Sequence, residues 1–153
     1  MPLTPLAFRT SFEENPKLAK AAHNLSSLLS AIEQKAIPET QTQKINEAIA
    51  GVNSFPGPDP ELVKQFKSAQ IGILSLLESD LQLVPKNHYQ NQWLALGLAA
   101  FGIPLGVAFG AALGNMAFIG IGIPIGMSIG IAVGTSKDNQ AKLEGRQLDW
   151  IAK

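Results

Sequence analysis

The chain has 153 residues, of which 12 are basic and 12 acidic, so its formal net charge is zero. A balanced charge provides no general attraction for nucleic acid, and we expect no nucleic-acid partner. The lack of cysteine excludes disulfides, thiolate catalysis and cysteine-ligated metals. The first residues contain no basic segment leading into an apolar one, so we expect no cleavable signal peptide.

Charged side chains are unevenly placed: nearly all of them lie in residues 9–86 and 137–153, and residues 93–136 carry none. A run of about 18 apolar residues reads as a membrane span, and this stretch is long enough for two. The chain is therefore predicted to divide into an irregular N-terminus (1–15), a helical soluble domain (16–85), a transmembrane helical hairpin (93–135) and a polar C-terminal tail (136–153).

The soluble domain is predicted to begin with an amphipathic helix. Pro16 suits its first turn, Asn15 is its expected cap, and Pro38 closes the segment because proline cannot continue a helix. Its apolar residues keep to helical spacing on one face: Leu18, Ala21, Ala22, Leu25, Leu28, Leu29 and Ile32.

Two further amphipathic helices are expected before Pro85. Thr40 is the expected cap of the second helix, and Gly51 its expected left-handed stop. The third is expected to open at Asp59-Pro60-Glu61, with Asp59 as the cap and an acid near the positive end of the helix. Three such helices form either a compact bundle or an oligomerising arm, and they offer a surface to a protein partner.

Two series of glycines at four-residue spacing lie within the uncharged stretch. They are Gly102, Gly106, Gly110 and Gly114, followed by Gly122, Gly126, Gly130 and Gly134. Successive members lie about 40° apart on an α-helix, so each series forms one groove. Because small residues at this spacing let helix backbones approach closely in lipid, all eight are predicted to pack helices together.

The same residues also alternate with a period of two, which is typical of a strand. Pro104 and Pro124 would each remove a hydrogen bond from the middle of a strand, whereas membrane helices tolerate proline as a kink. A membrane strand normally has one polar face, and the second face here consists largely of glycine and alanine. Helices kinked at the two prolines are therefore preferred over a glycine-rich β assembly.

The two membrane helices are predicted as residues 93–114 and 117–135, joined by a turn so short that they must run antiparallel. Residues equally far from residue 114 along the chain then lie at the same depth in the bilayer. Three such pairs are Pro104 with Pro124, Gly102 with Gly126, and Gly106 with Gly122. The predicted fold class is all-α: a three-helix soluble region followed by a two-helix antiparallel transmembrane hairpin.

Residues that flank the apolar stretch predict how it sits in a bilayer. Tyr89 and Trp93 lie where interfacial aromatic anchors are expected. Lys86 precedes the first helix, Lys137 and Lys142 follow the second, and the turn has no charge, so both termini are expected to be cytoplasmic. The polar tail is expected either on the membrane surface or free in solution.

Four sequence features follow one another between residues 85 and 148. They are Asn87-His88-Tyr89, Gln92-Trp93-Leu94-Ala95-Leu96-Gly97, the two glycine series, and Glu144-Gly145-Arg146-Gln147. Together they resemble bacterial glycine-zipper family membrane proteins. The resemblance covers less than half of the chain and implies two helices in a bacterial inner membrane, with no assigned activity. The Gly-Ile-Pro segments are richer in proline than a plain zipper.

No catalytic, cofactor-binding or metal-binding residue is predicted. His23 and His88 are far apart, without other ligands at metal-binding spacing. The predicted membrane helices hold no ionisable residue, which argues against a proton-coupled transporter or a charge-lined channel. We expect a non-enzymatic membrane protein that forms homo-oligomers through its glycine faces and carries a cytoplasmic scaffold or adaptor domain. The alternative is a membrane-permeabilising, toxin-like protein whose hairpin assembles into a lesion.

Overall fold

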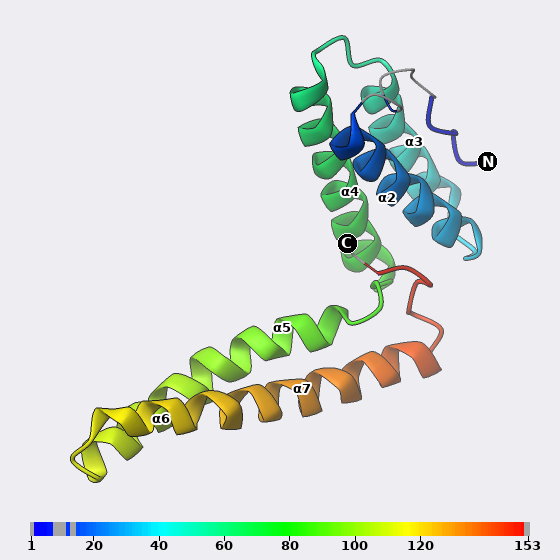
Figure 1. Ribbon diagram of the computed structural model, residues 1–153. Helices are drawn as coiled ribbons and strands as arrows, with labels where there is room; N and C mark the ends of the chain where they lie inside the picture. Colours follow the sequence, from blue (N-terminus) through cyan, green and yellow to red (C-terminus); the bar gives the residue numbers. More distant parts are fainter. Residues whose placement is uncertain (1, 8–11, 13–14, 152–153) are drawn as a thin grey trace. The chain divides into compact units, whose positions relative to one another are not determined.

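The computed structural model describes residues 2–7, 12 and 15–151 (Figure 1). These residues form helices and connecting segments, with no strand among them, which confirms the all-α prediction. They divide into two compact units: a helical unit of Met1–Pro85 with Leu148–Lys153, and a hairpin unit of Lys86–Gln147. Residues 148–151 thus belong to the same unit as the N-terminal helices.

Three helices build the helical unit: α2 (Pro16–Glu33), α3 (Glu39–Asn53) and α4 (Asp59–Leu81). Helix α4 packs against both α2 and α3. The predicted apolar faces meet in one core, whose largest fully buried side chains on these helices are Leu18, Leu25, Leu28, Ile32, Ile45, Ile49, Leu62, Ile73 and Leu77. Burial of these faces is what holds three otherwise marginal helices together.

The start of α2 matches the prediction, whereas α2 ends at Glu33, before Pro38, and the ends of α3 and the start of α4 also differ from the prediction. The side chain of Asn15 accepts hydrogen bonds from two backbone N–H groups of the first turn of α2, as predicted. Thr40 and Asp59 are not caps, because each helix begins one or two residues earlier than expected and places them in its first turn. Gly51 lies inside α3, because burial of Val52 in the core extends the helix beyond it.

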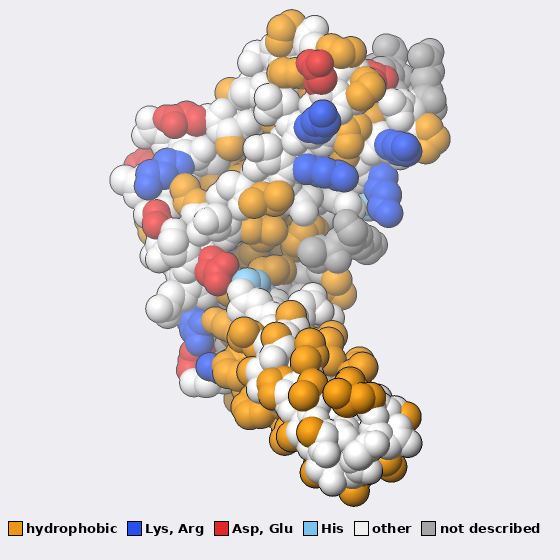
Figure 2. Space-filling model, turned by 90° about the vertical axis from the view of Figure 1, so that its left-hand side faces the viewer, with side chains coloured by type: hydrophobic (Ala, Val, Ile, Leu, Met, Phe, Trp, Pro, Cys, Tyr) orange, Lys and Arg blue, Asp and Glu red, His pale blue; other side chains and the backbone are white. Residues whose placement is uncertain are grey.

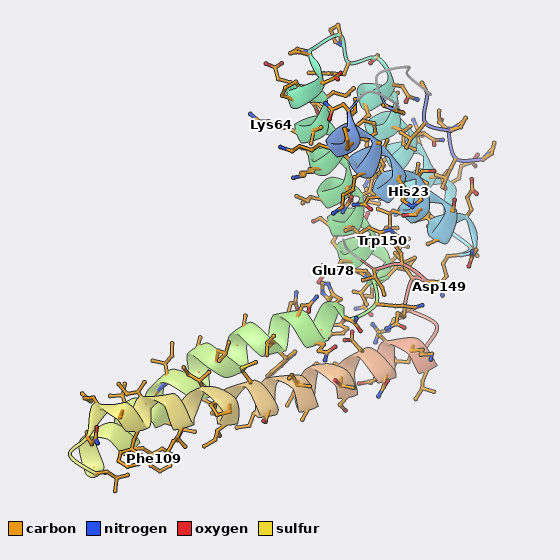
Figure 3. The ribbon with its side chains drawn as sticks, in the orientation of Figure 1. His23, Lys64, Glu78, Phe109, Asp149 and Trp150 are labelled. Atoms are coloured by element: carbon orange, nitrogen blue, oxygen red, sulfur yellow. The ribbon has the colours of Figure 1, made fainter. Side chains whose placement is uncertain are left out.

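Residues beyond the hairpin unit complete the core of the helical unit (Figure 3). Leu148 is 0% exposed and Trp150 5% exposed. The Leu148 N–H donates to the Val84 carbonyl at 2.9 Å, and Trp150 Nε1 donates to Ser27 Oγ at 3.0 Å. The prediction of a membrane-bound or free tail is therefore wrong at these residues, since α2 offers them a buried surface. The same contacts tie together the chain segments that enter and leave the hairpin unit.

The hairpin unit has two arms (Figure 1). The first arm is continuous and consists of α5 (His88–Gly97), a π-helical turn η1 (Leu98–Gly102) and α6 (Ile103–Ala112). The second arm consists of a 3₁₀ turn η2 (Met116–Phe118) and α7 (Ile119–Leu143). The arms pack side by side, which confirms the predicted two-helix hairpin and makes the strand alternative wrong. Helix α7 continues beyond the predicted end at residue 135, so the first part of the predicted polar tail is helical.

Trp150→Ala is expected to lower the free energy of unfolding of the helical unit by roughly 3–5 kcal/mol, because it removes a large buried side chain from between packed helices. Ile151→Ala is the matched control. The side chain of Ile151, the residue next to Trp150, is 47% exposed, and its loss should change stability by less than about 0.5 kcal/mol. Urea titration of the full chain in detergent, followed by far-UV circular dichroism, measures both. Equal losses would contradict the role assigned to Trp150.

Candidate functional site: a glycine-lined helical hairpin

Glycine lines the contact between the two arms. The buried residues of the first arm are all glycines, and in the second arm glycine accounts for all but two of them: Gly97, Gly102, Gly106 and Gly110 in the first, and Gly122, Gly126, Gly130 and Gly134 in the second. Close approach of this kind replaces side-chain interdigitation with backbone-to-backbone contact, which is available only where no Cβ intervenes.

The space around these glycines has no room for a methyl group. A Cβ atom added at Gly126 would lie 2.5 Å from Gly102 N, and one added at Gly122 would lie 2.6 Å from Gly106 Cα. Cβ atoms essentially never approach other atoms to within 3.0 Å. These are the glycine pairs predicted to lie at the same depth in the bilayer.

The close approach extends toward the open end of the hairpin, where residues other than glycine also take part in it. A Cβ added at Gly130 would lie 2.9 Å from Leu94 Cα, and one added at Gly134 would lie 2.5 Å from Gln90 Cα. The second arm therefore presents a continuous glycine surface along which the backbone of the first arm lies. Backbone contact runs along almost the whole length of the two arms.

Gly97 belongs to this contact, although the prediction omitted it. A Cβ added there would lie 2.9 Å from Gly130 Cα. Gly97 stands five residues before Gly102, and five residues on a regular α-helix would turn it to another face. The π-helical turn at Leu98–Gly102 adds one residue to the helical turn and returns Gly97 to the face of the later glycines.

Gly114 does not take part in the contact, contrary to its predicted role. Its φ is +66°, and a Cβ added there would meet nothing within 4 Å. The residue lies in the turn between the arms, where its freedom to adopt a left-handed conformation reverses the chain. The Asn115 side chain then accepts a hydrogen bond from the Ala117 N–H at 2.9 Å, as a turn residue should.

The two prolines predicted as matching kinks have different surroundings. Pro104 follows the π-helical turn, which relieves the clash between its ring and the carbonyl group four residues earlier. Pro124 lies within the uninterrupted helix α7, and its carbonyl accepts a hydrogen bond from Ser128 Oγ at 2.8 Å. The departure from regular helix thus occurs in the first arm.

A buried carboxylate closes the open end of the hairpin. Asp138 continues the glycine series of α7 by one more step of four and is 6% exposed. Its Oδ1 accepts from the Tyr89 N–H at 3.1 Å, and its Oδ2 accepts from the Gln90 N–H at 3.0 Å. An acid at the positive end of a helix satisfies N–H groups that have no partner within the helix. Asp138 of one arm therefore caps the helix of the other.

The two predicted interfacial anchors lie at this same end, inside α5. The ammonium group of Lys137 lies 5.9 Å from the centre of the Tyr89 ring and 5.6 Å from that of the Trp93 ring. Both distances suit a cation–π interaction. An ammonium group held on two amphipathic rings is the composition favoured at the boundary between lipid and water.

The segment after α7 carries an exposed ion pair between Glu144 and Arg146. Hydrogen bonds from Arg146 and then Gln140 hold the pKa of the Glu144 carboxyl below its ordinary value. The pKa of Arg146 is raised, first by Glu144 and then by Tyr89. Because both groups are exposed, the pair contributes little to stability, and it marks the polar end of the second arm.

Large apolar side chains cover the outside of the hairpin. Figure 2 shows them gathered over its surface, and Phe109 in Figure 3 is one example. The exposed large apolar residues of the two arms are Leu96, Phe101, Ile103, Val107, Phe109, Met116, Ile121, Ile123, Met127, Ile131 and Leu143. The usual order of a water-soluble protein is therefore inverted, with the smallest residue inside and the largest outside.

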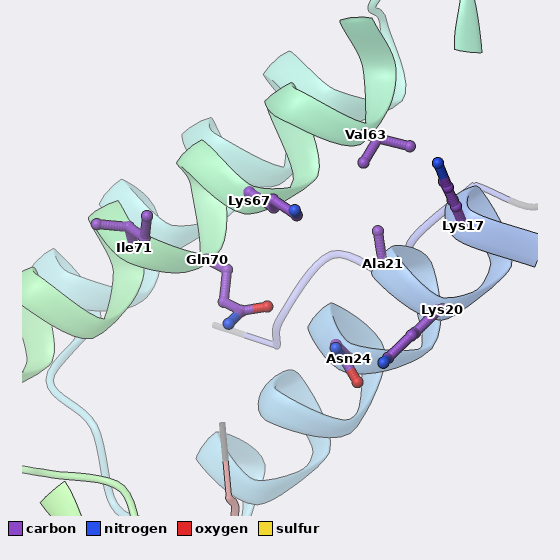
Figure 4. A pocket seen from close by; sticks show the side chains of 8 residues that line it. All are labelled: Lys17, Lys20, Ala21, Asn24, Val63, Lys67, Gln70 and Ile71. Atoms are coloured by element: carbon purple, nitrogen blue, oxygen red, sulfur yellow. The ribbon is translucent and has the colours of Figure 1, made fainter. Parts of the chain in front are cut away.

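A hollow of about 380 Å³ lies between α2 and α4 of the helical unit. Lys17 and Lys20 from α2 and Lys67 from α4 line it, together with Asn24 and apolar side chains (Figure 4). Within the described residues, no group of three histidine or acidic side chains is placed to hold a metal ion.

Gly122→Ala is expected to push the arms apart and to destabilise the hairpin by roughly 1–3 kcal/mol, because its methyl group would overlap the backbone of Gly106. Gly120→Ala is the matched control on the same helix, since a Cβ there meets nothing within 4 Å. That change should be neutral or stabilising by up to about 1 kcal/mol, from helix propensity. Unfolding in mixed micelles by titration with sodium dodecyl sulfate measures both, and a similar effect of the two changes would refute the close contact.

Asp138→Ala is expected to destabilise the first turn of α5 by about 0.5–2 kcal/mol, because two N–H groups lose their acceptor. Hydrogen exchange measured by NMR should become faster at the amides of Tyr89 and Gln90. Asn139→Ala, at the exposed neighbouring position, should leave both amides unchanged. Unaltered exchange in the Asp138 variant would mean that the carboxylate does not cap this helix.

Comparison with known proteins identifies no relative from which a function could be transferred. Neither a protein-family model, nor a curated protein, nor a solved structure matches the chain significantly. The resemblance to bacterial glycine-zipper membrane proteins therefore stays a prediction that rests on the residues themselves. The geometry of the hairpin is accordingly the basis on which a function is proposed.

Proposed function

We propose that the chain is a non-enzymatic membrane protein, with the hairpin unit inserted in a lipid bilayer and the helical unit acting as a scaffold or adaptor. The observation that carries this proposal is the inverted order of the hairpin, glycine inside and large apolar side chains outside. In water that order exposes apolar surface without burying any in return. In lipid it leaves the apolar side chains solvated and lets the backbones pack.

The degree of burial supports this proposal over a soluble one. The apolar core helix of a soluble protein is mostly buried, whereas the most apolar windows of the two arms are only 22% and 17% buried. The arms have 25 and 28 residues, which at 1.5 Å per residue correspond to about 38 and 42 Å. The hydrocarbon core of a bilayer is about 30 Å thick, so each arm is long enough to cross it and still reach the polar interface.

The topology proposed is one with both ends of the hairpin on the same side of the membrane, as a two-helix hairpin requires. The hydrogen bond between Leu148 and Val84 supports it, because the two segments that flank the hairpin meet within one folded unit. We assign that side to the cytoplasm of a bacterial inner membrane, following the lysines at the open end and the uncharged turn.

Self-association through the glycine faces, as first expected, requires a different state of the hairpin. The eight buried glycines of the two arms already face the opposite arm of the same hairpin. A second copy would have to open it before it could reach these faces. We therefore retain a homo-oligomer in the proposal and place its contacts elsewhere on the chain.

Thiol labelling of single-cysteine variants tests membrane insertion, since the chain contains no cysteine of its own. Lys86→Cys, Asn115→Cys and Lys142→Cys place one thiol before the hairpin, one in its turn and one after it. In sealed vesicles, a membrane-impermeant maleimide should label residues 86 and 142 from one side and residue 115 only from the other. Labelling of all three from the same side would contradict a membrane-spanning hairpin.

Dye release from liposomes separates this proposal from the membrane-permeabilising alternative. The closed hairpin holds no ionisable side chain along its glycine contact except Asp138 at the open end, so it offers no polar path through the bilayer. Liposomes that carry the inserted protein should therefore retain an entrapped dye at every protein concentration. Release that rises steeply with concentration would favour the lesion-forming alternative.

A further inference from the structure

Two asparagines of α3 hold the N-terminal segment, residues 2–7, along the helix. Asn46 Oδ1 accepts a hydrogen bond from the Thr4 N–H at 2.7 Å, and its Nδ2 donates to the Pro2 carbonyl at 3.1 Å. Asn53 repeats this arrangement: its Oδ1 accepts from the Ala7 N–H at 2.9 Å, and its Nδ2 donates to the Pro5 carbonyl at 3.1 Å. Each carboxamide therefore binds both polar groups of an extended backbone, which is the recognition of a main chain.

The sequence of the segment matches the spacing of the asparagines. Residues 2–7 read Pro-Leu-Thr-Pro-Leu-Ala, two copies of a Pro-Leu-X triplet, and each triplet is bound by one asparagine. Asn46 and Asn53 are seven residues apart, about 10.5 Å along an α-helix. Three residues of polyproline-type chain span about 9.3 Å. One triplet per two helical turns is thus the natural register of such a segment on a helix.

Side chains add to this backbone recognition. Leu3 and Leu6, the middle residues of the two triplets, are partly buried against the hydrophobic core, whereas Pro2 and Pro5 are exposed. A hollow of about 310 Å³ adjoins the segment, lined by Pro2, Leu3, Ile32, Glu33, Lys35, Ile37 and Thr42. Every third side chain therefore enters the unit, and the asparagines read the backbone between them. The surface around Asn46 and Asn53, here named the asparagine groove, recognises an extended Pro-Leu-X chain by chemistry that does not depend on its belonging to the same molecule.

We propose that the asparagine groove also binds residues 2–7 of a second copy of this chain, so that two copies exchange their N-terminal segments. The contacts are the same within one chain and between two, so their free energy cancels in the exchange. Only the entropy of association opposes the exchanged dimer, which is why swapping an identical element is a low-cost route to dimers. The groove belongs to the helical unit and the glycine faces to the hairpin unit, so the exchange leaves the hairpin closed.

Cross-linking between differently tagged copies tests the exchange. Asn46, Ala50 and Asn53 share one stripe of α3, because residues spaced by four and three lie on one helix face, and the exposed Ala50 therefore lies between the two asparagines that hold the segment. Full-length chains with Thr4→Cys and with Ala50→Cys are co-expressed under two tags, purified in detergent and treated with a short thiol-reactive cross-linker. Exchange predicts a cross-linked pair that carries both tags.

Two controls make each result decisive. A chain with both substitutions should form the cross-link, within one copy or between two exchanged copies, which shows that the two positions are within reach. A mixture of Thr4→Cys with Ser68→Cys, an exposed position on α4, measures random collision between copies. The Thr4/Ala50 mixture should give severalfold more two-tag product than this mixture, and Asn46→Ala with Asn53→Ala should abolish the excess while the helical circular dichroism is retained.

The possible outcomes divide cleanly. An internal cross-link without excess between copies would overturn the exchange and leave the segment as a strap on its own chain. Failure of the doubly substituted chain to form any cross-link, within one copy or between two, would overturn the asparagine groove itself. Neither result bears on insertion of the hairpin, which is measured separately by thiol labelling. Excess two-tag product that depends on both asparagines is the expected result.

Discussion

Approach of two helix backbones to the distance that only glycine allows is the constraint on which the hairpin depends. One methyl group at Gly122 or Gly126 would overlap the backbone of the opposite arm. Because the glycines contribute no side chains, the contact is held by many weak backbone interactions over a long distance. Such a contact cannot accommodate a larger side chain locally, since each added atom forces the arms apart over several residues. The large side chains are excluded from the contact and must face outward.

This exclusion is the physical basis of the membrane location proposed for the hairpin. Outward-facing isoleucine, leucine and phenylalanine are unfavourable in water and favourable in lipid, whereas the glycine contact can form in either. The two ends of the hairpin then differ in kind. At the closed end, the turn through Gly114 and Asn115 carries no charge. At the open end, Asp138, Lys137 and the rings of Tyr89 and Trp93 combine a helix cap with cation–π contacts.

The helical unit uses segments from both ends of the described chain to complete its fold. Three amphipathic helices provide the core, Leu148 and Trp150 enter it from beyond the hairpin, and residues 2–7 lie along α3. These additions suit a small bundle, whose core is close to the lower limit for independent stability. They also make the unit depend on the hairpin, because residues 148–150 reach the core only after the chain has passed through both arms. The side-chain amides of Asn46 and Asn53 show the other means of attachment, by main-chain hydrogen bonds.

Local patterns determined much of this structure. The helical spacing of Leu18 to Ile32, the Asn15 cap and the paired glycine series were sufficient to predict three amphipathic helices and an antiparallel hairpin. Only the tertiary structure decided the features that depend on partners distant in sequence. Gly97 joins the contact because a π-helical turn changes its face, and Asp138 is a cap because the other arm brings an unpaired helix end to it. Trp150 is buried because Ser27 and α2 lie within its reach. Spacing along one chain encodes which face a residue occupies, whereas the atoms that meet that face are set by the fold.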